Sequence, residues 1–158
     1  MIILGVDPGV KSAAYAFFAP IAPGRIAADD MPILDDEIDV YEFARLVRLH
    51  RPSMAIVEKA QSFPGNGHKS MFRYGTAYGK IRGVIAANSV EIHLIRPQDW
   101  KAKLGLSDDK DASRARAVEL FPHVSDRFKL KKHHNRAEAA LLAYYGAKFL
   151  GGPNARPV

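Results

Sequence analysis

Three acidic residues stand where apolar segments of the chain end or begin. Asp7 follows the apolar run 2–6, Glu58 follows the run 54–57, and Glu138 lies near the start of an otherwise apolar C-terminal segment. Carboxylate oxygens are hard ligands that suit Mg²⁺, and paired divalent ions catalyse phosphodiester hydrolysis. The three residues therefore predict a divalent-metal site that acts on phosphodiesters.

Each carboxylate also has a purely structural explanation. Asp7 could be a turn residue, because Pro-Gly follows it. Glu58 could form a salt bridge at a strand end, and Glu138 could form a surface ion pair with Arg136 or Lys132. We favour the metal site because a charge that faces the core from a terminal helix needs a counter-ion, which a metal supplies, and because all three acids are explained together.

The elements that must position these acids alternate between strand and helix patterns. Strands are expected at 2–6, 13–18, about 25–28, 54–57 and 91–95, and helices at about 40–50, 69–88, 97–104, 109–121 and 135–150. The acidic segment 35–37 is expected to lead into the first helix. This order predicts an α/β protein with a ribonuclease-H-like fold, in which a mixed five-stranded sheet is flanked by helices.

The expected connections bring two of the acids together. Strands 2–6 and 13–18 have the spacing of an antiparallel hairpin, whereas helix 40–50 is a crossover that makes strand 54–57 parallel to the first strand. Asp7 and Glu58 would then project side by side, and Glu138 would close the site from the last helix.

Composition indicates one domain with an anionic partner. The 158 residues form a single expected domain, 1–158, whose end at 151–158 is expected to be a flexible tail. Lys and Arg number 23 against 17 Asp and Glu, and 18 of the 23 basic residues follow Glu58. This balance favours a polyanion. The chain has no cysteine, which excludes disulfides and thiolate zinc sites, and no long apolar run, so we expect a cytoplasmic protein without a membrane partner.

Specific motifs give the chain a resemblance to a known family. Leu-Gly-Val-Asp-Pro-Gly at 4–9, Val-Glu at 57–58 and Arg-Ala-Glu-Ala at 136–139 resemble the RuvC family of Holliday junction resolvases, and the likeness spans nearly the whole chain. Trp-Lys-x-x-Leu-Gly-Leu at 100–106 and Leu-Phe-Pro at 120–122 resemble its compact phage and prophage-type members.

The resemblance implies a homodimeric endonuclease that resolves four-way (Holliday) DNA junctions by paired symmetric nicks. It also implies two Mg²⁺ ions in each active site, with Mn²⁺ able to substitute, and a fourth metal ligand one helical turn before Glu138. That turn holds His133, His134 and Asn135 in place of the usual acid. His134 shares a helical face with Glu138 and is expected to ligate metal or to protonate the leaving 3′-oxygen. Asn135 could instead coordinate through its carbonyl or cap the helix, and His133 also stays open.

Basic and aromatic residues complete the expected site. Lys101 and Lys110 match positions where the family contacts scissile phosphates and stabilises transition-state charge. Phe63, in a glycine-containing loop, is expected to insert at the crossover of the junction. The remaining residues expected to contact DNA phosphates are Lys69, Arg127, Lys129, Lys131 and Lys132. Solvation of the lysines and packing of Phe63 on the following helix are the alternatives.

Three other functions are compatible with parts of the pattern. A ribonuclease-H-like nuclease could act on RNA–DNA hybrids or structured RNA, and a junction-binding protein with weakened catalysis would fit the missing fourth acid. A sugar-kinase or actin-like ATP-binding module also begins with a strand and an Asp turn, but it needs a duplicated domain that 158 residues do not hold. The segment 100–122, with Lys110, favours the resolvase.

Overall fold

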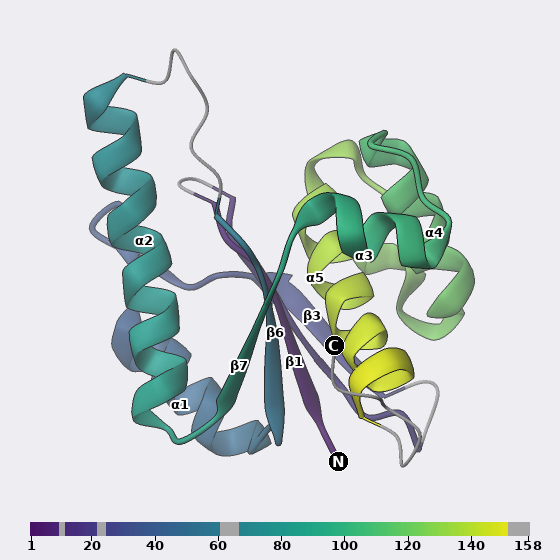
Figure 1. Ribbon diagram of the computed structural model, residues 1–158, viewed down its shortest axis with the longest axis horizontal. Helices are drawn as coiled ribbons and strands as arrows, with labels where there is room; N and C mark the ends of the chain where they lie inside the picture. Colours follow the sequence, from purple (N-terminus) through teal and green to yellow (C-terminus); the bar gives the residue numbers. More distant parts are fainter. Residues whose placement is uncertain (10–11, 22–24, 61–66, 152–158) are drawn as a thin grey trace.

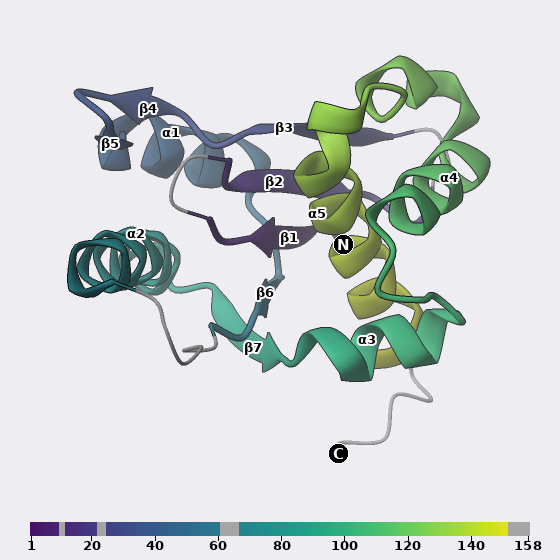
Figure 2. The ribbon, with the colours of Figure 1, turned by 90° about the horizontal axis from the view of Figure 1, so that it is seen from above.

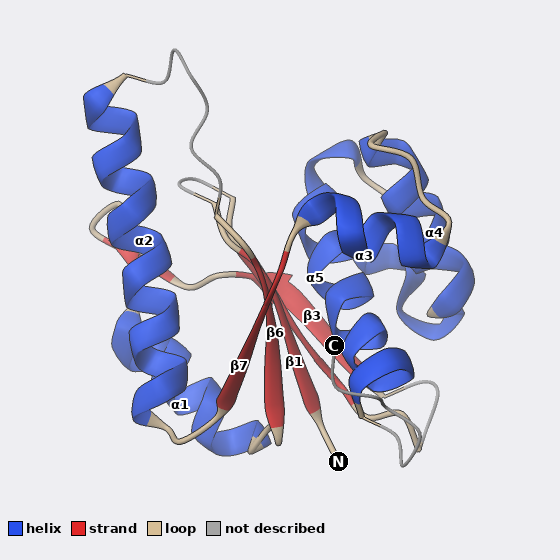
Figure 3. Cartoon of the chain, viewed as in Figure 1, coloured by secondary structure: helices blue, strands red, loops and turns tan. Residues whose placement is uncertain are grey.

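The computed structural model describes residues 1–9, 12–21, 25–60 and 67–151, and it contains a five-stranded mixed sheet (Figures 1 and 3). The strand order is β3-β2-β1-β6-β7. Strand β1 pairs antiparallel with β2, which pairs antiparallel with β3, whereas β1, β6 and β7 run parallel. Their bounds are β1 Ile3–Asp7, β2 Ala14–Phe18, β3 Ile26–Asp30, β6 Met54–Glu58 and β7 Glu91–Ile95. The predicted sheet is confirmed.

Helices cover both faces of this sheet. Figure 2 shows α2 and α5 on opposite sides of β1 and β6, with α1 on the side of α2 and with α3 and α4 on the side of α5. Short 3₁₀ segments, η1 and η2, replace most of the loop expected between α4 and α5. The bounds are α1 Val40–His50, α2 His68–Ala87, α3 Pro97–Leu104, α4 Lys110–Leu120, η1 Pro122–Arg127, η2 Lys131–His133 and α5 His134–Tyr145, which continues as a π-helical turn, Gly146–Leu150.

The sheet has a hydrophobic core on each face, and the side chains of β1 alternate between them. This alternation determines which face Asp7, the last residue of β1, points to. Leu4 and Val6 pack in the core below α1 and α2, whereas Ile3 packs in the core below α5. Gly5 also faces α5, because a Cβ on it would lie 2.0 Å from the backbone oxygen of Ala139. Successive side chains of a strand point to opposite faces, so Asp7 continues the set that faces α5.

The same alternation places the second acid on that face. In β6, Ile56 belongs to the core below α5, and Glu58 follows it by two residues. Parallel β1 and β6 pair in the register Val6 with Val57. Both acids therefore lie at the C-terminal ends of neighbouring strands and on the same face of the sheet, as predicted.

One small element was not expected. Strands β4 (Ile33–Leu34) and β5 (Glu37–Ile38) form a hairpin whose turn residues, Asp35 and Asp36, have φ values of 51° and 62°. The acidic segment precedes helix α1, as expected, but it forms this hairpin first, because aspartate tolerates the left-handed conformation that the tight turn requires. The acid that caps α1 is Asp39, which accepts hydrogen bonds from two backbone N–H groups of the first turn.

The expected tail lies, from residue 152 onward, outside the described residues. In the four described ranges, no helix has the length and apolar character needed to cross a membrane.

Candidate active site

The three acids singled out from the sequence come together where β1 and β6 end and α5 begins. Asp7 and Glu138 are buried, with 7% and 8% of their surface exposed, and Glu58 is half-buried. Burial raises the pKa of Asp7 well above its usual value, and the negative charges of Glu58 and then Glu138 raise it further. The acids therefore form one electrostatic cluster.

Glu58 is held by a residue that sequence reasoning did not assign to the site. The indole Nε1–H of Trp100 donates to Oε2 of Glu58 at 2.8 Å, and Trp100 itself is fully buried. Burial raises the pKa of Glu58, and the Trp100 hydrogen bond opposes that rise. The sequence signal is the Trp-Lys-x-x-Leu-Gly-Leu motif at 100–106, in which only Lys101 was expected to act at the site.

Glu138 has a cationic partner within the protein. Lys101 Nζ lies 3.1 Å from Oε1 of Glu138, and the two side chains are only 12% and 10% exposed. The hydroxyl of Ser113, which is fully buried, donates to the same oxygen at 3.2 Å. The counter-ion that the sequence required is thus a lysine, and Lys101 lies directly at the acid cluster.

The donor chemistry of this cluster fits a hard divalent cation. Three carboxylates, two of which raise the pKa of the third, Asp7, are a suitable set of oxygen ligands for Mg²⁺. Their side chains do not all aim at one point, however. Considering the residues described, no three His, Cys, Asp or Glu side chains are grouped closely enough to hold an ion, and both glutamates are turned onto protein donors. Because the printed partners engage Oε2 of Glu58 and Oε1 of Glu138, a cation would take the other oxygen of each carboxylate, with the side chains drawn closer together.

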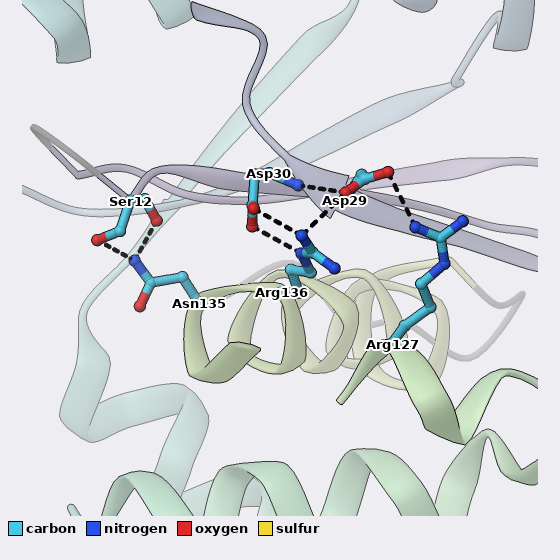
Figure 4. A network of polar contacts seen from close by, with 6 residues as sticks. All are labelled: Ser12, Asp29, Asp30, Arg127, Asn135 and Arg136. Atoms are coloured by element: carbon cyan, nitrogen blue, oxygen red, sulfur yellow. Dashed lines mark hydrogen bonds and ion pairs between the residues drawn. The ribbon is translucent and has the colours of Figure 1, made fainter. Parts of the chain in front are cut away.

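The candidates for a fourth ligand differ in burial. His134 is half-exposed, and its Nδ1 lies 3.2 Å from the backbone oxygen of Lys131. Asn135 is buried, and its Nδ2 donates to the backbone oxygen and, at 2.7 Å, to the hydroxyl of Ser12 (Figure 4). The carbonyl oxygen is consequently the atom of Asn135 that could reach a cation. His133 is buried with Nδ1 unpartnered in the described part of the chain, and burial lowers its pKa.

An ion-pair network fixes the first turn of α5 to the end of β3 (Figure 4). Arg136 donates two hydrogen bonds of 2.6 Å to Asp30 and lies 3.3 Å from Asp29, which also pairs with Arg127 at 3.1 Å. The sequence suggested Arg136 as an ion-pair partner of Glu138, but its guanidinium pairs with Asp29 and Asp30 of β3. The network holds the helix start that carries Glu138.

The basic residues expected to contact DNA have different surroundings. Arg127 is engaged by Asp29, and Lys129 pairs with Asp126 at 2.6 Å. Lys131 and Lys132 are exposed on η2. Half of this basic run is therefore partly neutralised by neighbouring acids.

The other basic positions and Phe63 lie farther along the chain. Lys110 begins α4, is exposed, and lowers the pKa of Asp7, which places it within electrostatic reach of the acid cluster. Lys69 is exposed in the first turn of α2. Phe63 lies outside the described residues.

Tyr74 is a second neighbour that sequence reasoning did not assign to the site. Burial raises its pKa to about 12, with further contributions from the charges of Asp7 and Glu58. The phenol, on α2, therefore lies within electrostatic reach of the acid cluster. Its spacing on the helix carried no signal of that proximity.

Comparison with known proteins gives one sequence relative and several similar structures. No family model matches the chain. Over 89 residues, 55% of this chain, it is 33% identical to the chloroplastic Holliday junction resolvase MOC1 of Chlamydomonas reinhardtii. The matched stretch is 10% of that protein, so the chain spans about a tenth of the length of this relative.

The similar structures cover nearly the whole chain. RuvC of Thermus thermophilus in complex with a Holliday junction substrate superposes with a TM-score of 0.68 at 14% identity, covering 94% of this chain and 95% of that one. The fowlpox virus Holliday junction resolvase gives 0.56 at 22% identity, covering 95% and 100%. The yeast mitochondrial resolvase Ydc2 gives 0.55 at 12% identity, covering 90% and 77%. The chain therefore has the ribonuclease-H-like fold of RuvC and of these viral and mitochondrial proteins.

Proposed function

We propose that this protein is a metal-dependent endodeoxyribonuclease that resolves four-way DNA junctions by paired symmetric nicks. The observation that carries the proposal is the cluster of Asp7, Glu58 and Glu138, two of them buried, with Lys101 at 3.1 Å from one of its oxygens. The fold supports the same conclusion, because three solved proteins that share it are named as Holliday junction resolvases or as a complex with their substrate.

The acid cluster would hold two Mg²⁺ ions, or Mn²⁺ in their place. Bound ions of this kind activate water and stabilise the leaving oxygen. Asp7, Glu58 and Glu138 would bind them, with His134 or Asn135 as the fourth ligand. The burial of Asn135 supports that residue as the ligand. His134 is supported by its Nδ1 contact with the backbone oxygen of Lys131, because a bond through Nδ1 would leave Nε2 for the metal.

Basic residues would place the DNA on this cluster. The positive charges of Lys101 and Lys110 lower the pKa of Asp7. A scissile phosphate bound at the acids would therefore lie within electrostatic reach of both lysines. The exposed Lys131 and Lys132 would hold a DNA arm through phosphate contacts, together with Lys69, Arg127 and Lys129. Phe63 is proposed, from the sequence alone, to enter the junction crossover.

Symmetric nicks require two active sites, so we propose a homodimer formed through α2. Its exposed face carries Gly75, Gly79 and Gly83, and a Cβ added to any of them would meet nothing within 4 Å. Phe72, 77% exposed, lies on the same face. Light scattering should give twice the chain mass, and Gly79→Leu should shift the protein towards monomer.

Nicking of synthetic substrates tests the function. The protein is incubated with a four-way junction, a linear duplex of matched sequence and an RNA–DNA hybrid, each with Mg²⁺, Mn²⁺ or EDTA. We expect metal-dependent paired nicks in the junction, lost in Asp7→Asn and kept in Asp36→Asn, which removes a carboxylate from the exposed β4–β5 turn.

Two other results would redirect the proposal. Cleavage of the hybrid in preference to the junction would favour the ribonuclease-H-like alternative. Junction binding without cleavage in any metal would favour a binding protein with weakened catalysis, for which the sequence His-His-Asn at 133–135, in place of the family's usual acid, is the supporting observation.

A further inference from the structure

Trp100 is a core residue whose indole N–H forms a hydrogen bond with one of the three acids. It is the one tryptophan of the chain, it is fully buried, and its indole N–H bonds to Glu58, a proposed metal ligand, at 2.8 Å. An indole N–H can only donate a hydrogen bond. It therefore suits the ionised carboxylate of Glu58 and would be left without a partner if that side chain turned away.

The hydrogen bond selects one orientation of a side chain that could otherwise rotate. Glu58 is the last residue of β6 and is half-buried, so its carboxylate is not fixed by packing alone. The indole engages Oε2, and among the described residues no hydrogen bond is made to Oε1, which is the oxygen that a cation would take. Hydrogen bonds from outside a metal's ligands are the usual means of orienting those ligands.

The neighbouring residue extends this support to a second carboxylate. Lys101 Nζ lies 5.5 Å from the centre of the Trp100 ring and 3.1 Å from Oε1 of Glu138. Two consecutive residues of α3 thus reach two of the three acids from one side. Packing alone would require neither contact.

We propose that Trp100 is a positioning residue that holds Glu58 in its metal-binding orientation through the indole N–H. The inference rests on the proposed function, because it assumes that Glu58 binds a divalent ion. Loss of such a supporting hydrogen bond typically weakens metal affinity about 10- to 100-fold. The same loss is expected here when the N–H is removed and the shape of the side chain is kept.

Because the chain has one tryptophan, analogue incorporation changes this site alone. One preparation carries 3-benzothienylalanine, which replaces the indole N–H with sulfur in a ring of nearly the same shape. The matched control carries 5-fluorotryptophan, which keeps the N–H. Calorimetric titration with Mn²⁺ should give a dissociation constant about 10- to 100-fold higher for the benzothienyl protein and one within about threefold of the natural protein for the control.

The outcomes separate this inference from the function on which it rests. Equal Mn²⁺ affinity in the two analogue proteins would overturn the role of Trp100 and leave the metal site standing. Failure of the natural protein to bind Mn²⁺ would overturn both.

Fluorescence of the natural protein gives a second measurement that does not depend on an analogue folding correctly. A cation on Oε1 of Glu58 changes the electric field at the indole, so Mg²⁺ should produce a saturable change in Trp100 emission. The change should be absent in Glu58→Gln. Calorimetric Mg²⁺ binding with unchanged emission would contradict the proposal.

Discussion

Replacement of Lys101 by methionine should destabilise the metal-free protein and make its stability depend on Mg²⁺. The Lys101 ammonium lies 3.1 Å from Glu138 in a pair whose side chains are 12% and 10% exposed. Methionine keeps most of the length and apolar character of lysine but removes the charge. The carboxylate of Glu138 would then stay buried beside Asp7, whose pKa already shows its repulsion.

The size of the effect follows from the burial of the pair. Removing one partner of a buried ion pair costs roughly 3–5 kcal/mol. We expect the lower limit, about 3 kcal/mol, because the Ser113 hydroxyl still donates to Glu138. For a chain of this length, that loss corresponds to a melting temperature about 6–12 °C lower.

Urea unfolding followed by circular dichroism, in EDTA and in Mg²⁺, measures this cost. Mg²⁺ should stabilise Lys101→Met more than the natural protein, because in the natural protein the ammonium competes with the ion for Glu138. Adding Glu138→Gln to Lys101→Met should recover about 1–3 kcal/mol, since it removes the unpaired charge. Lys69→Met, at an exposed lysine of α2, should change stability by less than about 0.5 kcal/mol.

Either of two results would contradict an unpaired Glu138 charge as the cause of the lost stability. One is a Lys101→Met protein as stable in EDTA as the natural protein. The other is a loss of stability that neither Mg²⁺ nor Glu138→Gln relieves, because the loss would then come from packing rather than from an unpaired charge.

Three further predictions follow from particular contacts. Gly5→Ala should cost about 3 kcal/mol in urea unfolding, because its Cβ would meet the α5 backbone at 2.0 Å; a loss below about 1 kcal/mol would contradict the close packing. The pKa of Asp7 is raised above 3.8 in the folded protein, so the folded state binds its proton more tightly than the unfolded state. Stability in EDTA should therefore fall as the pH rises from about 4 through the raised pKa and stay lower above it. Asp7→Asn removes this loss and should be more stable than the natural protein at neutral pH. A lower free energy of unfolding for Asp7→Asn at neutral pH, measured by urea unfolding, would contradict the prediction. Lys132→Ala should weaken junction binding and reduce its salt dependence more than Arg127→Ala, because Arg127 is already paired with Asp29; fluorescence anisotropy at several salt concentrations would show the opposite order if the pair does not form.

Local patterns were sufficient to predict the elements that carry the site. Helix α1 was predicted over the residues it occupies, because its apolar spacing is a pattern that acts within a few residues. The side-by-side placement of Asp7 and Glu58 followed from strand alternation and one parallel crossover. The β4–β5 hairpin was missed because strands of two residues carry no period to detect.

The partners of the acids could not be predicted in the same way. Trp100 and Glu58 are 42 positions apart, and their contact depends on how α3 docks after β7. The predicted alternatives for Glu138 were charges close to it in sequence, yet the helix turns Arg136 towards β3 and receives Lys101 from another element. A sequence pattern assigns residues to faces, whereas the docking of helices decides which side chains meet.

The network that joins α5 to β3 also determines when the acid cluster can form during folding. Arg136 and Asp30 are 106 positions apart, and Arg127 and Asp29 are 98 apart. Closing such long loops is slow, and these contacts can form only after β3 has paired with β2. A nascent chain would therefore carry Asp7 and Glu58 on their strands well before Glu138 is synthesised and docked, so the complete set of acids is a late product of folding.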